Sequence, residues 1–156
     1  MTVLLDAPQR FENLCAIART LDAFGLATCL VHDAFGLVRP RYGKVRRRVA
    51  RSVSTGAFER VEFVRVGSPE TVSLPGRRIA TVRQPGAVSL HDVRFEPADT
   101  LLFGSEAAGL SAGALATADV HLTVPMQGGA ESLNLSVAVA VVLYEARRQL
   151  GRLAEV

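Results

Sequence analysis

The chain has no tryptophan, only two cysteines, and no apolar run as long as a membrane-spanning helix requires. A bilayer span needs about 18 or more consecutive apolar residues, so we expect no membrane segment. Cys15 and Cys29 are too few for a disulfide framework, and no cysteine or histidine spacing suits a structural metal. The first residues also lack the basic start of a secretion signal. We therefore expect a soluble, cytoplasmic protein without a structural metal.

Acidic residues are missing from one long stretch, because every charged side chain between Asp33 and Glu59 is basic. The whole chain has a net charge of +3 and this stretch holds seven cations, so the remainder is net negative. Such a run is commonly a solvated surface, but clustered arginines also suit bidentate contacts with phosphate. Its helical part is expected to have Val45, Val49 and Val53 on one side and arginines on the other. The candidates for nucleic-acid contact are Arg39, Arg41, Lys44, Arg46, Arg47, Arg48 and Arg51.

Short apolar runs alternate with helical patterns along the whole length of 156 residues. This alternation predicts an α/β fold, with a mostly parallel sheet and helices on both faces. Residues 84–99 contain two prolines and a glycine and have no clear pattern. Without repeats or linkers, the chain is expected to form a single domain over residues 1–156. The expected strands are residues 2–5, 26–32, 61–66, 78–82, 100–103 and 120–124.

The first helical pattern, which follows Asn13 and stops at Gly25, has small residues where a solvated face would be polar. Arg19 lies almost opposite the apolar stripe, and its neighbours there are Cys15, Ala16 and Ala23. The apolar stripe itself consists of Leu14, Ile17, Ala18, Leu21 and Phe24. This composition indicates that a second surface covers the far face of the helix, and a partner subunit is an economical explanation.

A loop after the expected strand at residues 100–103 has the sequence GSEAAG. Its Gly-x-x-x-x-Gly spacing resembles a phosphate-binding loop, but that motif continues with Lys and then Ser or Thr. Here Leu110 and Ser111 follow, so a nucleoside triphosphate site is not expected. No Gly-x-Gly-x-x-Gly follows any strand, which excludes the usual dinucleotide site. A plain alternative is a turn in which Glu106 is favoured by the dipole of the following helix.

A second loop runs from Val124 through two glycines to Glu131-Ser132-Leu133-Asn134, where about four turns of apolar helix begin. Pro125 and the glycines keep this backbone out of regular ladders, so its N–H and C=O groups need other partners. A strand-to-helix connection with Ser132 or Asn134 as N-cap would explain the polar residues without any function. A polar cluster at the mouth of a buried helix also suits a ligand site.

Taken together and in order, three segments resemble the three sequence motifs of the SpoU/TrmH family of RNA 2′-O-ribose methyltransferases, in the SPOUT class. They are residues 13–25, 101–110 and 124–136, and one departure is Cys15, where the family commonly has glycine. The resemblance implies a C-terminal trefoil knot within the α/β fold. It also implies that S-adenosylmethionine is held mainly by backbone groups of the second and third motifs. The implied cofactor contacts are Val82, Gly104, Val124, Met126, Ser132 and Leu133.

The implied reaction is transfer of a methyl group to a ribose 2′-oxygen, a weak nucleophile that must be positioned and relieved of its proton. Arg19 has been assigned the role of base in such enzymes, but a guanidinium is not deprotonated in proteins. We therefore expect Arg19 to hold the adjacent phosphate and stabilise the oxyanion. We expect the two asparagines to orient Arg19 or the ribose, and Glu106 to hold its loop or pair with a cation. The family's functional residues fall on Asn13, Arg19, Glu106, Ser132 and Asn134.

The resemblance also implies a homodimer that acts on RNA, with tRNA favoured over rRNA because compact members often act on tRNA. We expect no separate RNA-binding extension, so the basic residues become the candidates for phosphate contact. One alternative is a catalytically silent knotted protein that binds RNA or assists assembly. Another is the same methyltransferase acting on rRNA.

Overall fold

A seven-stranded sheet, in which the strand order is β3-β2-β1-β6-β4-β7-β5, organises the computed structural model. The structure describes residues 1–39, 42–74 and 76–151. Every pair of neighbouring strands is parallel, which confirms the predicted α/β fold. The strands are β1 (Thr2–Asp6), β2 (Thr28–His32), β3 (Glu62–Val66), β4 (Arg78–Thr81), β5 (Val88–Ser89), β6 (Thr100–Phe103) and β7 (Val120–Thr123). The helices are α1 (Phe11–Ala23), α2 (Lys44–Ser54), α3 (Ala57–Arg60), α4 (Ala112–Ala116) and α5 (Leu135–Gln149), with a 3-10 turn η1 (Pro69–Thr71).

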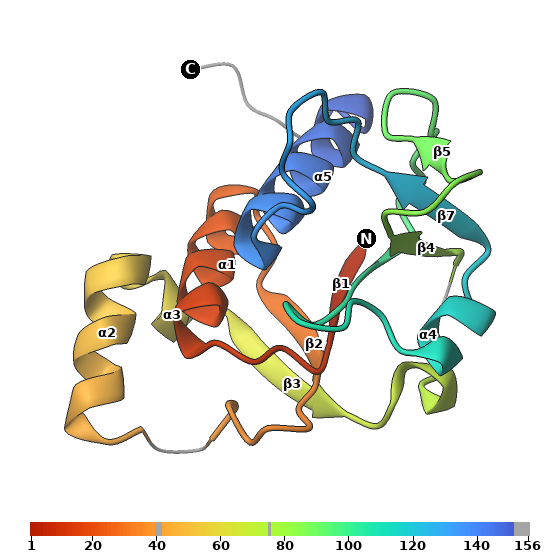
Figure 1. Ribbon diagram of the computed structural model, residues 1–156. Helices are drawn as coiled ribbons and strands as arrows, with labels where there is room; N and C mark the ends of the chain where they lie inside the picture. The colour runs from red at the N-terminus through yellow and green to blue at the C-terminus, as the bar shows by residue number, and fades with distance from the viewer. Residues whose placement is uncertain (40–41, 75, 152–156) are drawn as a thin grey trace.

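Successive residues of the central strands point to opposite faces of the sheet and build two cores. Val3 and Leu5 of β1 belong to the larger cluster, which includes residues of α1 and α5. Leu4 belongs to the smaller cluster on the other face, with Ala114 of α4. Both faces are therefore covered by helices, as predicted, and Figure 1 shows α1 and α5 side by side over the sheet. The trefoil knot stays a prediction.

The helix α1 begins at Phe11, so Asn13 lies inside its first turn instead of before it. Its end agrees with the prediction, because Gly25 has a φ of +70° just beyond the last turn. Cys15 is fully buried in the larger core, which agrees with the expectation that the far face of this helix is covered. At Cys15 the cover comes from the same chain, because α1 is flanked by α5 on one side and by α2 and α3 on the other. Burial raises the pKa of the Cys15 thiol to about 11.

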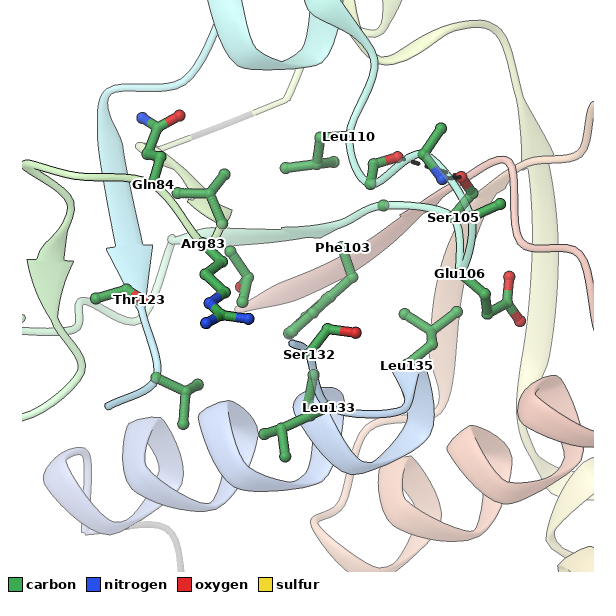
Figure 2. Close-up of a pocket in the computed structure, with 18 of the residues that line it drawn as sticks. Arg83, Gln84, Phe103, Ser105, Glu106, Leu110, Thr123, Ser132, Leu133 and Leu135 are labelled. Carbon is green, nitrogen blue, oxygen red and sulfur yellow. Dashed lines mark hydrogen bonds between the residues drawn. The ribbon is translucent and has the colours of Figure 1, made fainter. Parts of the chain in front are cut away.

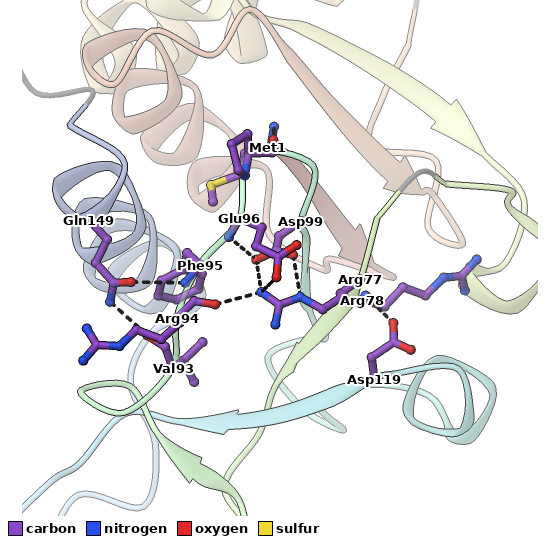
Figure 3. A network of polar contacts seen from close by, with 11 residues as sticks. Met1, Arg77, Arg78, Val93, Arg94, Phe95, Glu96, Asp99, Asp119 and Gln149 are labelled. Carbon is purple, nitrogen blue, oxygen red and sulfur yellow. Dashed lines mark hydrogen bonds and ion pairs between the residues drawn. The ribbon is translucent and has the colours of Figure 1, made fainter.

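Side-chain hydrogen bonds connect the segment that showed no pattern, residues 84–99, to distant parts of the chain (Figure 3). Buried Asp99 receives a forked contact from Arg77, with distances of 3.0 and 2.9 Å, and ties the start of β4 to the start of β6. Gln149 of α5 donates to the carbonyl of Val93 over 2.9 Å and accepts from the N–H of Phe95 over 3.1 Å. Contacts of this kind leave no periodic signal, which explains why the two-residue strand β5 was missed.

In the part of the chain that the structure describes, no helix has both the length and the apolar character needed to cross a bilayer. Within the same residues, no group of three or more His, Cys, Asp or Glu side chains is placed to hold a metal ion.

Candidate active site

A cavity of about 410 Å³ lies where β4, β6 and β7 end. Its volume is in the range of small-molecule sites, and parallel sheets bind ligands at the carboxyl ends of their strands. Figure 2 shows that the walls come from the segments after these strands and from the start of α5. The lining includes all six residues that were expected to contact a cofactor, namely Val82, Gly104, Val124, Met126, Ser132 and Leu133.

The loop after β6 folds back on itself at a position that only glycine can occupy. A Cβ on Gly104 would lie 1.9 Å from the carbonyl carbon of Gly109, far inside any real contact. The backbone of Ser105 closes the turn, since it donates to Gly109 O over 2.9 Å and accepts from Gly109 N over 3.0 Å. The loop's end is fixed by Ser111, whose N–H donates to the buried carboxylate of Asp6 over 2.8 Å. One wall of the cavity is therefore rigid.

Glu106 projects from this loop to the start of α1, far from it in the sequence. Its carboxylate accepts from the N–H groups of Gln9 and Arg10 over 2.8 and 3.2 Å. It also accepts from Asn13 Nδ2 over 2.6 Å. An acid was expected to be favoured by the dipole of the following helix, but the helix terminus that Glu106 contacts is that of α1.

Asn13 also forms a hydrogen bond with a residue of the third motif. Because Asn13 donates its Nδ2 to a carboxylate, its Oδ1 faces away and accepts from Asn134 Nδ2 over 3.1 Å. Asn134 is the N-cap of α5, with its Oδ1 accepting from Ser136 N over 2.8 Å, so the cap is Asn134 and not Ser132. We call Glu106, Asn13 and Asn134 the polar row. It joins the three sequence motifs beside the cavity.

Arg19 is the predicted catalytic residue that the fold does not bring to the cavity. It lies six positions after Asn13 on α1, which places the two side chains on different faces of the helix. Arg19 is exposed and lines a shallow hollow with Val53 of α2 and Ala140 of α5. Ser132 and Glu106 line the cavity and the two asparagines adjoin it, so four of the five predicted residues are brought together.

The surface around Arg19 is apolar. Ala23 is exposed on α1, and α5 exposes Val137, Val141 and Tyr144 at helical spacing, with Tyr144 half exposed at 50%. The rings of Tyr144 and Phe24 lie 6.1 Å apart and join the two helices. We call Ala16, Arg19, Ala23, Val137, Val141 and Tyr144 the α1–α5 face. Exposed large apolar side chains that are contiguous indicate a contact surface.

The basic segment forms α2 at the outer margin of the molecule (Figure 1), and its side chains differ in role. Arg46 is half-buried and its guanidinium lies 5.2 Å from the ring centre of Phe11, so it contributes to packing. Of the three valines expected on one side of this helix, Val49 and Val53 pack against the core, whereas Val45 lies in the first turn and is 78% exposed. Arg41 lies outside the described residues. The exposed cations of the segment are Arg39, Lys44, Arg47, Arg48 and Arg51.

Among the lining residues that were not predicted from the sequence are Thr81 and Arg83. Thr81 ends β4, and its buried Oγ1 has no hydrogen-bond partner among the described residues. Arg83 reaches across the cavity wall, where its NH1 donates to the carbonyls of Ala130 and Glu131. The only signal for either residue is its place next to Val82 at a strand end.

The sequence matches the model of the SpoU rRNA Methylase family over residues 1–144. It is 32% identical over 152 residues to the tRNA (guanosine(18)-2'-O)-methyltransferase of Escherichia coli (strain K12), covering 96% of this chain but only 63% of that protein. It is 31% identical over 161 residues to the tRNA (cytidine(34)-2'-O)-methyltransferase of Ancylobacter novellus, covering 99% and 96% of the two chains. The fold is similar to that of the SpoU methyltransferase AviRb from Streptomyces viridochromogenes in complex with the cofactor AdoMet. The TM-score is 0.76 and the identity 30%, over 96% of this chain and 60% of that one.

Proposed function

The chain belongs to the SpoU rRNA Methylase family, and from this premise we propose that it transfers a methyl group from S-adenosylmethionine to a ribose 2′-oxygen of RNA. One observation carries the proposal: the six residues implied as cofactor contacts come from three separate segments and line a single cavity. The names of the relatives, both tRNA 2′-O-methyltransferases, agree with it.

The cavity suits this cofactor chemically. Val82, Val124 and Leu133 offer apolar surface for an adenine ring, and the loop backbone around them offers donors and acceptors for its edge. The unpartnered Oγ1 of Thr81 offers a further hydrogen bond. When bound there, the cofactor supplies an electrophilic methyl group on a sulfonium.

The polar row would shape the site and not transfer the proton. Both carboxylate oxygens of Glu106 accept hydrogen bonds: Oε2 from Gln9 N, and Oε1 from Arg10 N and Asn13 Nδ2. No cation lies within ion-pairing distance of Glu106 in the described structure, which favours the loop-holding role over the pairing role. Ser132 projects into the cavity with its hydroxyl unengaged by the described residues, and it would contact the cofactor or the ribose.

We propose that the active protein is a homodimer in which the α1–α5 face of one protomer meets its partner. This arrangement would cover Val137, Val141 and Tyr144. It would also explain why Arg19, the proposed phosphate and oxyanion contact, does not line the cavity of its own protomer. A site completed by Arg19 of the partner would form only in the dimer.

The substrate we propose is RNA, with tRNA favoured over rRNA, in the cytoplasm. Arg39, Lys44, Arg47, Arg48 and Arg51 are exposed and close together in the sequence, which suits contact with a phosphate backbone. Both named relatives are tRNA enzymes, and the chain matches one of them over 96% of that protein's length.

The decisive experiment supplies the protein with isotopically labelled S-adenosylmethionine and total RNA from cells that lack the protein. Label should enter RNA as 2′-O-methylribose, and mapping would identify the molecule and the nucleotide. If calorimetry detects RNA binding but neither cofactor binding nor transfer, the protein is instead a catalytically silent RNA-binding or assembly protein. Label in rRNA alone would replace tRNA by rRNA as substrate.

A further inference from the structure

We infer that Arg83 binds the α-carboxylate of the cofactor's amino-acid end, and this inference rests on the proposed function. Arg83 follows β4 and lies on the cavity wall, where Figure 2 shows its side chain extending toward Ser132. None of the sequence motifs includes this residue.

The cavity has one cation that no acid neutralises. Its only charged lining residues in the described structure are Arg83 and Glu106. Glu106 is engaged by the start of α1 and lies at the opposite side of the cavity in Figure 2. No carboxylate of the described residues lies within 4.0 Å of the Arg83 nitrogens. A carboxylate of a bound ligand would therefore give the Arg83 guanidinium the anionic partner that it lacks among the described residues.

The guanidinium is anchored on one side and open on the other. Its NH1 donates to the carbonyls of Ala130 and Glu131, the first of these over 3.3 Å. Among the described residues, its Nε and NH2 have no acceptor. The planar group is thus oriented in advance, with donors left for a carboxylate. Preorganisation of this kind favours ligand binding because little side-chain freedom is lost.

The contact of Arg83 with Ala130 and Glu131 permits a second interpretation, in which Arg83 only fastens the loop that carries Ser132 and Leu133. The two roles differ in what they predict for ligands. A loop fastener would matter equally for every ligand of the cavity. A carboxylate contact would matter only for ligands that have the carboxylate.

The test compares S-adenosylmethionine with decarboxylated S-adenosylmethionine, which keeps the adenosine, the sulfonium and the amine. Calorimetry would measure both ligands on the wild-type protein, on Arg83→Gln and on Arg83→Lys. We expect the wild type to prefer the carboxylate-bearing ligand by about 10-fold or more, the range of a charge-assisted hydrogen bond. In Arg83→Gln this preference should fall to within about 2-fold, with binding of the decarboxylated ligand unchanged, and Arg83→Lys should keep part of it.

Arg94→Gln is the matched control, because Arg94 is exposed and outside the cavity lining, and the change in charge is the same. It should leave both affinities unchanged. Equal weakening of the two ligands by Arg83→Gln, with an unchanged melting temperature, would overturn the inference in favour of loop fastening. An unaltered preference would overturn it outright. Absence of any cofactor binding by the wild type would instead contradict the proposed function.

Discussion

Asn13 Nδ2 lies 2.6 Å from Oε1 of Glu106, although 93 positions separate the two residues in the sequence. The same asparagine accepts from Asn134 over 3.1 Å, so a single side chain connects the start of α1, the loop after β6 and the start of α5. A substitution in this polar row should therefore alter the shape of the cavity and its affinity for a ligand.

Replacing Glu106 with glutamine should weaken cofactor binding. A glutamine side chain has one acceptor oxygen and an amide NH₂, and the NH₂ would face N–H donors that the carboxylate now satisfies. A hydrogen bond to a charged group contributes about 1.5–3 kcal/mol, so losing one should reduce the affinity by about 10-fold in calorimetry. Glu131→Gln is the control, because its exposed side chain makes no hydrogen bond within the described structure. Wild-type affinity in Glu106→Gln would contradict the loop-holding role.

Arg19→Ala should abolish methyl transfer, because it removes the proposed phosphate and oxyanion contact. Cofactor affinity should stay within about 2-fold of the wild type, because Arg19 does not line the cavity. A filter assay of label transfer and calorimetry would measure the two effects separately. Full activity of this variant on its native RNA would refute the assignment.

Mixed dimers would show which protomer supplies Arg19. Arg19→Ala has an intact cavity, and a Gly104→Ala protomer has an intact Arg19 with a disturbed cavity. If Arg19 acts across the interface, mixing the two inactive variants should restore up to one working site per mixed dimer. If it acts within its own protomer, the mixture should stay inactive. Size-exclusion chromatography with light scattering would confirm that mixed dimers form.

Gly104→Ala should damage the cavity, since the added methyl group would lie 1.9 Å from Gly109 C and 2.1 Å from Leu110 N. Backbone must then move, and backbone strain of this kind typically costs about 1–3 kcal/mol. Gly128→Ala adds the same methyl group on the loop after β7, where nothing lies within 4 Å. We expect lowered thermal stability and lost cofactor binding in the first variant only. Equal behaviour of the two variants would show that the loop after β6 is pliable.

Reversal of exposed cations on α2 should reduce the salt dependence of RNA binding. Arg48→Glu and Lys44→Glu change side chains that are exposed and make no side-chain contact in the described structure. The slope of log affinity against log salt concentration is negative, and its magnitude should decrease by about 0.7–0.9 for every phosphate that is no longer neutralised. Arg94→Glu is the control elsewhere on the surface. An unchanged slope would mean that α2 is merely a solvated surface.

Arg46 should behave differently from the other cations of α2. Its guanidinium lies over the ring of Phe11, so Arg46→Ala should reduce stability by about 0.5–1 kcal/mol in chemical denaturation. Its effect on the salt slope should be smaller than that of Arg48→Glu.

The pH dependence of stability should carry a contribution from Glu145. Arg148 and Gln149 donate to this carboxylate and lower its pKa from 4.5 to about 2. The folded state therefore releases this proton more readily than the unfolded state, so the stabilisation is present above about pH 4.5 and is lost as the pH falls toward 2. In Arg148→Ala the pKa should rise toward 4.5, measured by NMR titration of the carboxyl carbon. An unchanged pKa would show that the ion pair does not persist in solution.

The sequence pattern predicted the alternating strands and helices because each central strand is apolar on both faces, as in Val3-Leu4-Leu5. The six expected cofactor contacts, which line the cavity, came from the family resemblance and not from the pattern. The small residues of the first helix predicted a covered far face, but a helical wheel does not show which elements surround the helix, so cover of Cys15 from within the same chain was not foreseen. Arg46 was counted as a free cation because its contact with Phe11 joins residues 35 positions apart.

Arg83 and Thr81 were missed for a related reason. Their importance depends on what lies opposite them in space: two carbonyls of a distant loop for Arg83, and the lack of any partner among the described residues for Thr81. Neither property has a local signature. Pairings of this kind become visible only when the chain is folded.

The span of the polar row has a consequence for synthesis of the protein. The hydrogen bond from Asn134 to Asn13 joins two residues that lie 121 positions apart in the sequence. The helix α5 begins directly after Asn134 and packs on α1. A nascent chain emerges from the ribosome N-terminus first, so the sheet can gather strands from β1 to β7 before Asn134 is available. The ligand site is therefore completed only after Asn134 and α5 have been synthesised, and its ability to bind a ligand would report that α5 has docked on α1.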